Sequence, residues 1–164
     1  MSENVKEVFR KIRFISELVL VALVALTGLM YAVYTDLKLG NTSSWLFFAV
    51  ITTIGSAALM ILSESFKEKK VLCIGLKIGA LLLLILFLVV LFFYKNAYIN
   101  LQIAEATKNL TDASVIASKT AQATEAAKKS VQGILIISII LAIFSIIAEG
   151  LHLTSSIITI DDDK

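Results

Sequence analysis

Long apolar runs and polar stretches of unequal length alternate along the chain. A helix needs roughly 20 residues, at about 1.5 Å per residue, to cross about 30 Å of hydrocarbon. Runs without a charged residue occur at 18–35, 45–63, 78–94 and 134–148. With their flanking residues, they predict four transmembrane helices at about 14–35, 45–63, 71–94 and 131–156.

Composition agrees with this pattern, since 58% of the residues are hydrophobic and the chain contains no proline. A chain of this kind is typical of an integral membrane protein. Strands are not expected in the hydrocarbon, because a helix satisfies all of its backbone groups internally. The first run is longer than a signal peptide core and lacks a small-x-small cleavage site, so we interpret it as a retained helix. We therefore predict an all-α protein with one membrane domain over residues 1–164.

The three connections between the predicted spans differ in length. Those at 36–44 and 64–70 are short, so helices one to three should be antiparallel neighbours. The third, at about 95–130, has no glycine or proline and is rich in good helix formers. A break at "KNLTDAS", where Thr111 or Asp112 starts a new helix, predicts an outer helical hairpin that extends helices three and four. A solvated, partly frayed connector is the alternative interpretation.

The hairpin segment also carries a heptad pattern of mostly small residues, which suits close contact between its two helices. Its members are Ile99, Ile103, Ala106, Leu110, Ala113, Ala117, Thr120, Thr124, Ala127 and Val131.

Charge and glycosylation patterns give the orientation. Basic residues are more frequent on the side that holds the N-terminus, which places both termini in the cytosol. Asn41 and Asn109 begin Asn-x-Thr/Ser patterns in the two loops that would then be outside, and both are glycosylation candidates. The localisation expected is the plasma membrane or a membrane of the secretory pathway.

Residues able to carry catalysis are scarce. The chain has one cysteine, Cys73, and one histidine, His152, with no orienting third group, and too few ligands for a zinc site. No glycine-rich phosphate loop follows a strand. We therefore expect no enzyme activity, no metal and no cofactor. Cys73, beside two lysines at the start of helix three, is a palmitoylation candidate; the alternative is a small apolar residue in packing.

Glycines mark the expected contact faces of the helices. Gly75 and Gly79 form a GxxxG pattern in helix three, which permits close approach of another backbone. Gly28 in helix one and Gly55 in helix two lie among small residues and are further packing candidates.

A polar stripe interrupts the fourth apolar run. One helix face, reached in steps of four and three, holds Ser138, Ala142, Ser145, Glu149, His152 and Ser156, and such a stripe should turn away from lipid. Counting at about 1.5 Å per residue places Glu149 and Lys77 at a similar depth, near the inner edge of the hydrocarbon. We predict a structural clamp between Lys77 and Glu149, with an ion or proton pathway as the alternative.

The order of a short first outer loop, a short inner loop and a longer second outer loop resembles the layout of tetraspanins. That resemblance is one of topology. The large loop of tetraspanins carries a Cys-Cys-Gly motif and disulfides, whereas residues 95–130 contain no cysteine. No function or site residue is therefore carried over from that family.

Together these patterns favour a non-enzymatic multi-pass protein that acts in lateral association, membrane organisation or scaffolding. The alternative is a subunit of an oligomeric channel or transporter that uses the polar stripe. The partners expected are the lipid bilayer and other membrane proteins or further copies of the chain, as a homo- or hetero-oligomer, and no nucleic acid.

Overall fold

The computed structural model describes residues 3–34, 41–66 and 68–161. For some helical residues only the backbone is described; these are 24, 27–34, 41–43, 134, 155 and 158–161. The elements are α1 (Glu3–Tyr34), α2 (Asn41–Ser65), α3 (Lys70–Thr107) and α4 (Ala113–Asp161). Because these residues contain helices and no strand, the all-α prediction is confirmed for the described part of the chain.

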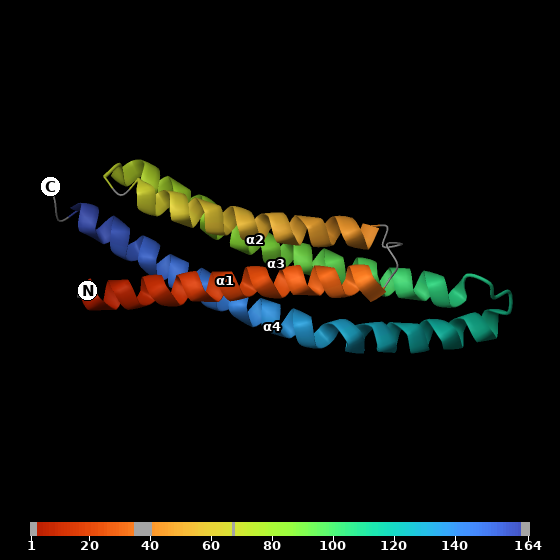
Figure 1. Ribbon diagram of the computed structural model, residues 1–164. Coiled ribbons are helices and arrows are strands. Elements are labelled where there is room, and N and C mark those ends of the chain that lie inside the picture. Colours follow the sequence, from red (N-terminus) through yellow and green to blue (C-terminus); the bar gives the residue numbers. More distant parts are fainter. Residues whose placement is uncertain (1–2, 35–40, 67, 162–164) are drawn as a thin grey trace.

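The helices form an up-down-up-down bundle (Figure 1). α2 packs on α1 and α3, and α4 packs on α3 and α1, whereas the backbones of the diagonal pairs do not come close to each other over the described residues. The start of α1 and the end of α4 therefore lie at the same end of the bundle (Figure 1). We refer to this as the terminal end.

Three described stretches are long and apolar enough to cross a bilayer, which indicates a multi-pass membrane protein. They are Ser44–Ser65, Lys70–Thr107 and Leu135–Thr154. The expected span at about 14–35 falls partly outside the described residues.

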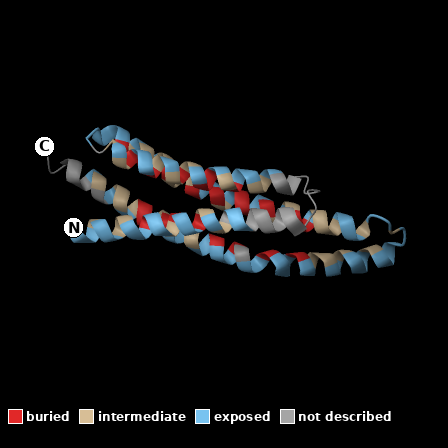
Figure 2. Ribbon diagram, viewed as in Figure 1, coloured by how far each residue is buried: buried red, intermediate tan, exposed pale blue. Residues whose placement is uncertain are grey.

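The interior of the bundle is apolar over most of its length. Phe87 and Leu84 of α3 are fully buried against Leu20 of α1 and Ala142 of α4. In Figure 2 the buried residues lie where the helices face one another, and exposed residues cover the outer faces. Many exposed side chains are Ile, Leu, Val or Phe, including Phe92 and Ile147. An apolar outer surface of this kind suits contact with lipid rather than with water.

Two glycines hold α2 close to α3. A Cβ placed on Gly55 would lie 3.1 Å from Leu83 Cδ1, and a Cβ on Gly79 would lie 3.1 Å from Leu59 Cδ1. Each helix thus presents a glycine to a leucine of the other. Gly75, the first glycine of the GxxxG pattern, has open space where its Cβ would be, so it makes no such contact. The surroundings of Gly28 lie outside the described residues.

α3 and α4 continue past the ends of α1 and α2 as a helical hairpin (Figure 1). Its heptad residues differ in burial along its length. Ile99, Ala127 and Val131 are buried at the base, whereas Ala113 and Ala117 are exposed near the tip. Alanine side chains add little apolar area, so the two helices cover each other only at the base.

The turn of the hairpin lies at residues 108–112, inside the stretch where the sequence predicts a break. Asp112 caps α4, since its Oδ1 accepts hydrogen bonds from Ser114 N at 2.8 Å and Ser114 Oγ at 2.7 Å. Asn109, the glycosylation candidate of the second outer loop, is exposed in this turn. Asn41 is the first residue of α2, and its side chain lies outside the described residues.

The cap of α4 should depend on pH. Hydrogen bonds from the side chain and backbone of Ser114 hold the pKa of Asp112 below its ordinary value of 3.8. Because the folded pKa is lowered, the contribution of the cap is present above about pH 4 and is lost as the pH falls through the lowered pKa.

We expect Asp112→Ala to speed amide hydrogen exchange at Ser114 and Val115 several-fold near neutral pH. Asp112→Asn, which keeps a capping oxygen, should change it little; equal acceleration in both variants would contradict a capping role.

Candidate functional site

The polar stripe of α4 faces the interior of its own bundle. Ser138, Ser145 and Glu149 are buried, and Glu149 is 0% exposed. Lys77 of α3 is also buried, and His152 is half-buried. Every buried charged side chain among the described residues lies in the half of the bundle nearer the terminal end; these are Arg13, Glu17, Lys77 and Glu149.

Glu149 pairs with an arginine of α1. Arg13 Nη1 lies 3.2 Å from Glu149 Oε2, and both side chains are almost completely buried. Arg13 Nη2 also lies 3.8 Å from Glu64 Oε1 of α2, and Arg10 Nη1 lies 3.6 Å from Glu64 Oε2. We call Arg13, Glu17, Glu64 and Glu149 the charge cluster. It connects α1, α2 and α4 through one guanidinium group.

Lys77 and Glu149 interact electrostatically, as the predicted clamp requires, but neither is the direct partner of the other. Lys77 Nζ lies 3.0 Å from His152 Nδ1 and donates to Ser156 Oγ at 3.1 Å. A neutral imidazole accepts such a hydrogen bond through Nδ1. Lys77 therefore meets α4 about one or two turns closer to the terminal end than depth counting suggested, because such counting does not fix the register of two helices.

Arg13 is a buried residue of this site that the sequence analysis does not identify. A local signal was available. Arg13, Glu17 and Leu20 are spaced by four and three residues, so they share one face of α1. Leu20 belongs to the apolar core, and this places the two charged residues on the inward face as well.

Glu17 is buried beside Glu149 and Arg13, and it interacts electrostatically with both. Its Oε1 atom has no hydrogen-bond partner among the described residues. Two buried carboxylates thus share one arginine, which makes Arg13 the most important charge of the cluster.

Serine hydroxyls connect further pairs of helices. Ser16 Oγ and Ser145 Oγ are 3.0 Å apart and join α1 to α4, while Ser16 Oγ also donates to the Arg13 carbonyl at 2.8 Å. Ser56 Oγ donates to the Ala80 carbonyl at 3.0 Å and joins α2 to α3. Short polar contacts of this kind stabilise helix association within hydrocarbon.

The interior between the charge cluster and the hairpin contains no charged side chain among the described residues. On α4 the stripe ends at Ser138, and Leu135, Val131 and Ala127 follow it toward the hairpin. Phe87, Val90 and Leu91 of α3 belong to the same apolar core. Among the described residues, charged side chains therefore do not continue through the length of the bundle.

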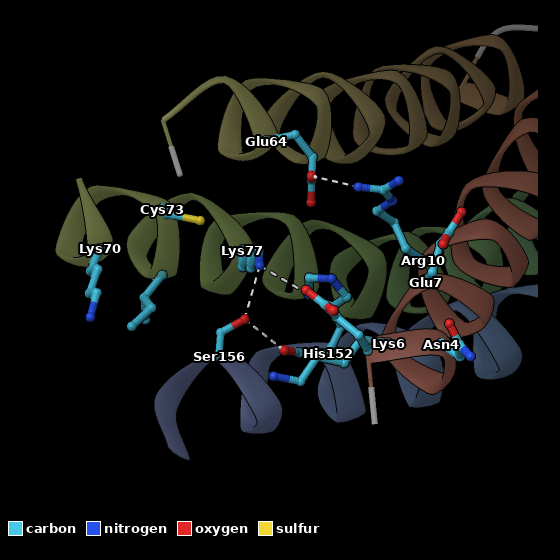
Figure 3. A pocket seen from close by; sticks show the side chains of 12 residues that line it. Asn4, Lys6, Glu7, Arg10, Glu64, Lys70, Cys73, Lys77, His152 and Ser156 are labelled. Atoms are coloured by element: carbon cyan, nitrogen blue, oxygen red, sulfur yellow. Dashed lines mark hydrogen bonds and ion pairs between the residues drawn. The ribbon is translucent and has the colours of Figure 1, made fainter. Parts of the chain in front are cut away.

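A cavity of about 510 Å³ opens at the terminal end, beside the charge cluster. Figure 3 shows Lys77 between α3 and α4 in this cavity, with its ammonium group directed at His152 and Ser156. Cys73, the palmitoylation candidate, is buried and also lines the cavity. In the described ranges, no three His, Cys, Asp or Glu side chains come together as a metal site.

A second cavity of about 800 Å³ is an apolar groove between α1 and α2, with Leu18 and Ile54 among its walls. Arg13 and Glu64 lie at its polar edge.

Comparison with protein families, curated proteins and solved structures found no match for this chain.

Proposed function

We propose that the chain is a non-enzymatic membrane protein with four spans, in which α1 provides the fourth, and that it acts in lateral association or scaffolding. Both termini lie in the cytosol in this arrangement, and the hairpin of α3 and α4 extends to the other side. The position of both ends of the chain at one end of the bundle supports an even number of spans (Figure 1). Lys6, Arg10, Lys11 and Lys70 lie toward that same end, as the positive-inside rule requires.

The observation that carries the proposal is that the polar stripe of α4 contacts α1 of the same chain. Ser145 contacts Ser16, and Glu149 pairs with Arg13. A channel or transporter built on this stripe needs Glu149 to face a water path, alone or between subunits. Burial of Glu149 against the chain's own α1 supports a role in holding the helices together instead.

The exposed part of the hairpin is the surface that we assign to partners. Ala113 and Ala117 are on the heptad face but remain exposed near the tip. Small side chains on a helix allow another helix to approach closely. Another membrane protein or a second copy of this chain is the partner expected.

Disulfide crosslinking in membranes tests this assignment. In a Cys73→Ser background, we expect Ala117→Cys to give a crosslinked species of higher mass, because Ala117 lies on the face assigned to partners. Lys119→Cys is the matched control, since two positions along a helix rotate the side chain by about 200° and direct it away. Equal crosslinking of both variants, or of neither, would count against the hairpin as the partner surface.

Reconstitution into liposomes separates the proposal from the transport alternative. We expect purified wild-type protein to leave the ion permeability of the vesicles unchanged. An ion flux that the wild type carries and Glu149→Gln abolishes would overturn the proposal in favour of a channel or transporter.

A further inference from the structure

The polar cavity at the terminal end has the dimensions of a ligand site. Its volume of about 510 Å³ lies within the range of roughly 300 to 1,000 Å³ that is typical of small-molecule pockets. Side chains from α1, α2, α3 and α4 line it, including Lys6, Glu64, Lys77 and Ser156. The apolar groove between α1 and α2 is a separate feature of the bundle.

Lys77 is a buried cation whose direct hydrogen-bond partners are neutral groups. Lys77 is 4% exposed, and its ammonium group contacts His152 Nδ1 and Ser156 Oγ. None of the described carboxylates forms an ion pair with it. A buried ammonium group is costly unless a negative charge compensates it. Glu64 and Glu149 act on Lys77 electrostatically, but an anion bound in the cavity would be the first negative group in direct contact with its ammonium group among the described residues.

Two carboxylates that line the cavity already have basic partners. Glu64 lies near Arg10 and Arg13, and Glu7 pairs with Lys11 at 2.9 Å. Glu3 is the remaining carboxylate, and it is exposed in the first turn of α1. Glu64 acts on Lys77 electrostatically but forms no ion pair with it, so no described carboxylate lies in direct contact with this ammonium group.

The donors suit a phosphate group better than a carboxylate. Lys77 comes from α3, and Lys6 and Asn4 extend from α1 on the other side of the cavity (Figure 3). The Ser156 hydroxyl already donates to the His152 carbonyl at 2.9 Å, so the lysines and Asn4 provide the donors. Lysine binds phosphate as a point charge, whereas recognition of a planar carboxylate favours the paired N–H groups of arginine. Arg10, the arginine of this cavity, is already paired with Glu64.

We propose that this cavity binds a phosphate-bearing anion, with the Lys77 ammonium group as its central contact and Lys6 as a contact at the rim. The positive end of the α3 helix dipole lies on the same side, since α3 begins at Lys70 and Lys69 provides no side-chain cap. The phosphate belongs either to the headgroup of an anionic lipid or to a soluble compound, and both sources present the same group to Lys77.

Two binding measurements on the full-length protein distinguish these sources. Isothermal titration with pyrophosphate, in nanodiscs made of phosphatidylcholine alone, measures binding of a soluble phosphate. Native mass spectrometry measures retention of phosphatidic acid against phosphatidylcholine. We expect the wild type to bind at least one of these probes, and the one that binds identifies the source.

Lys77→Met removes the ammonium group and keeps an unbranched chain of similar length. Because a hydrogen bond to a charged group contributes about 1.5 to 3 kcal/mol, we expect this variant to weaken binding about tenfold or more. Lys119→Met is the matched control, since it removes the same charge from an exposed position of the hairpin and should leave affinity nearly unchanged. Lys6→Met, at the half-buried rim, should weaken binding by a smaller factor and tests the site independently of the bundle interior.

The proposal is overturned if the wild type binds neither pyrophosphate nor phosphatidic acid at millimolar concentrations. It is equally overturned if Lys77→Met and Lys119→Met weaken binding alike, because the effect would then be one of net charge. Should Lys77→Met fail to fold, unchanged binding by Lys6→Met overturns the proposal as well.

Discussion

Replacing Arg13 by methionine is expected to lower the free energy of unfolding by about 3 kcal/mol or more, the typical cost of removing one partner from a buried ion pair. The guanidinium group lies 3.2 Å from Glu149 and 3.8 Å from Glu64. Glu17 is buried beside them. Without Arg13, Glu149 loses its ion-pair partner and Glu17 loses the cation that acts on it. Unfolding in mixed micelles by titration with dodecyl sulfate, followed by circular dichroism, measures the change.

Arg10→Met is the matched control for Arg13→Met. Arg10 pairs with the same Glu64, at 3.6 Å, but its side chain is 44% exposed. Solvent screens an exposed pair of this kind, so we expect a loss below about 1 kcal/mol. Equal losses in the two variants would contradict a central role for Arg13.

Adding Glu149→Leu to Arg13→Met should recover part of the lost stability. The double variant removes both members of the pair and leaves fewer uncompensated charges than the single one. If the effects of the two substitutions simply add, Arg13 and Glu149 do not interact energetically as their distance implies.

Replacing Gly79 by leucine has the second-largest expected effect, a loss of about 1 to 3 kcal/mol in the free energy of unfolding. Its Cβ alone would lie 3.1 Å from Leu59 Cδ1, and the longer side chain has to force α2 and α3 apart. The adjacent contact between Gly55 and Leu83 depends on the same close approach. The same micelle titration measures the change.

Gly75→Leu provides a control on the same helix, with the same residue types. No atom lies within 4 Å of the position that its Cβ would take. Leucine also has a higher helix propensity than glycine, by somewhat under about 1 kcal/mol. We therefore expect this variant to be as stable as the wild type or slightly more stable. A similar loss at both positions would show that the GxxxG pattern acts as a unit, against the geometry.

The local parts of the structure were predictable from sequence because their signals are local. Apolar runs located α2 and the membrane-spanning parts of α3 and α4, and the polar stretch around Asp112 located the turn between α3 and α4. The spacing of Ser138, Ser145 and Glu149 identified one face of α4, since a helix repeats every 3.6 residues. These features depend on residues that are close together in the chain.

Contacts between distant helices were not predictable in the same way. Glu149 pairs with Arg13 rather than Lys77, and Gly79 rather than Gly75 receives a leucine of α2. Both outcomes depend on the rotation and register of one helix against another. Depth counting is too coarse for this, because an error of one turn, about 5.4 Å, changes the partner of a side chain.

The sequence by itself therefore determined the helices, the turn of the hairpin and the inward face of α4, because hydrophobic periodicity and capping residues act over one or two turns. Only the tertiary structure decided which charges meet, which glycine is packed and where a cavity remains in front of Lys77. These depend on how side chains from separate helices fill a shared interior, and that packing is a property of the whole bundle.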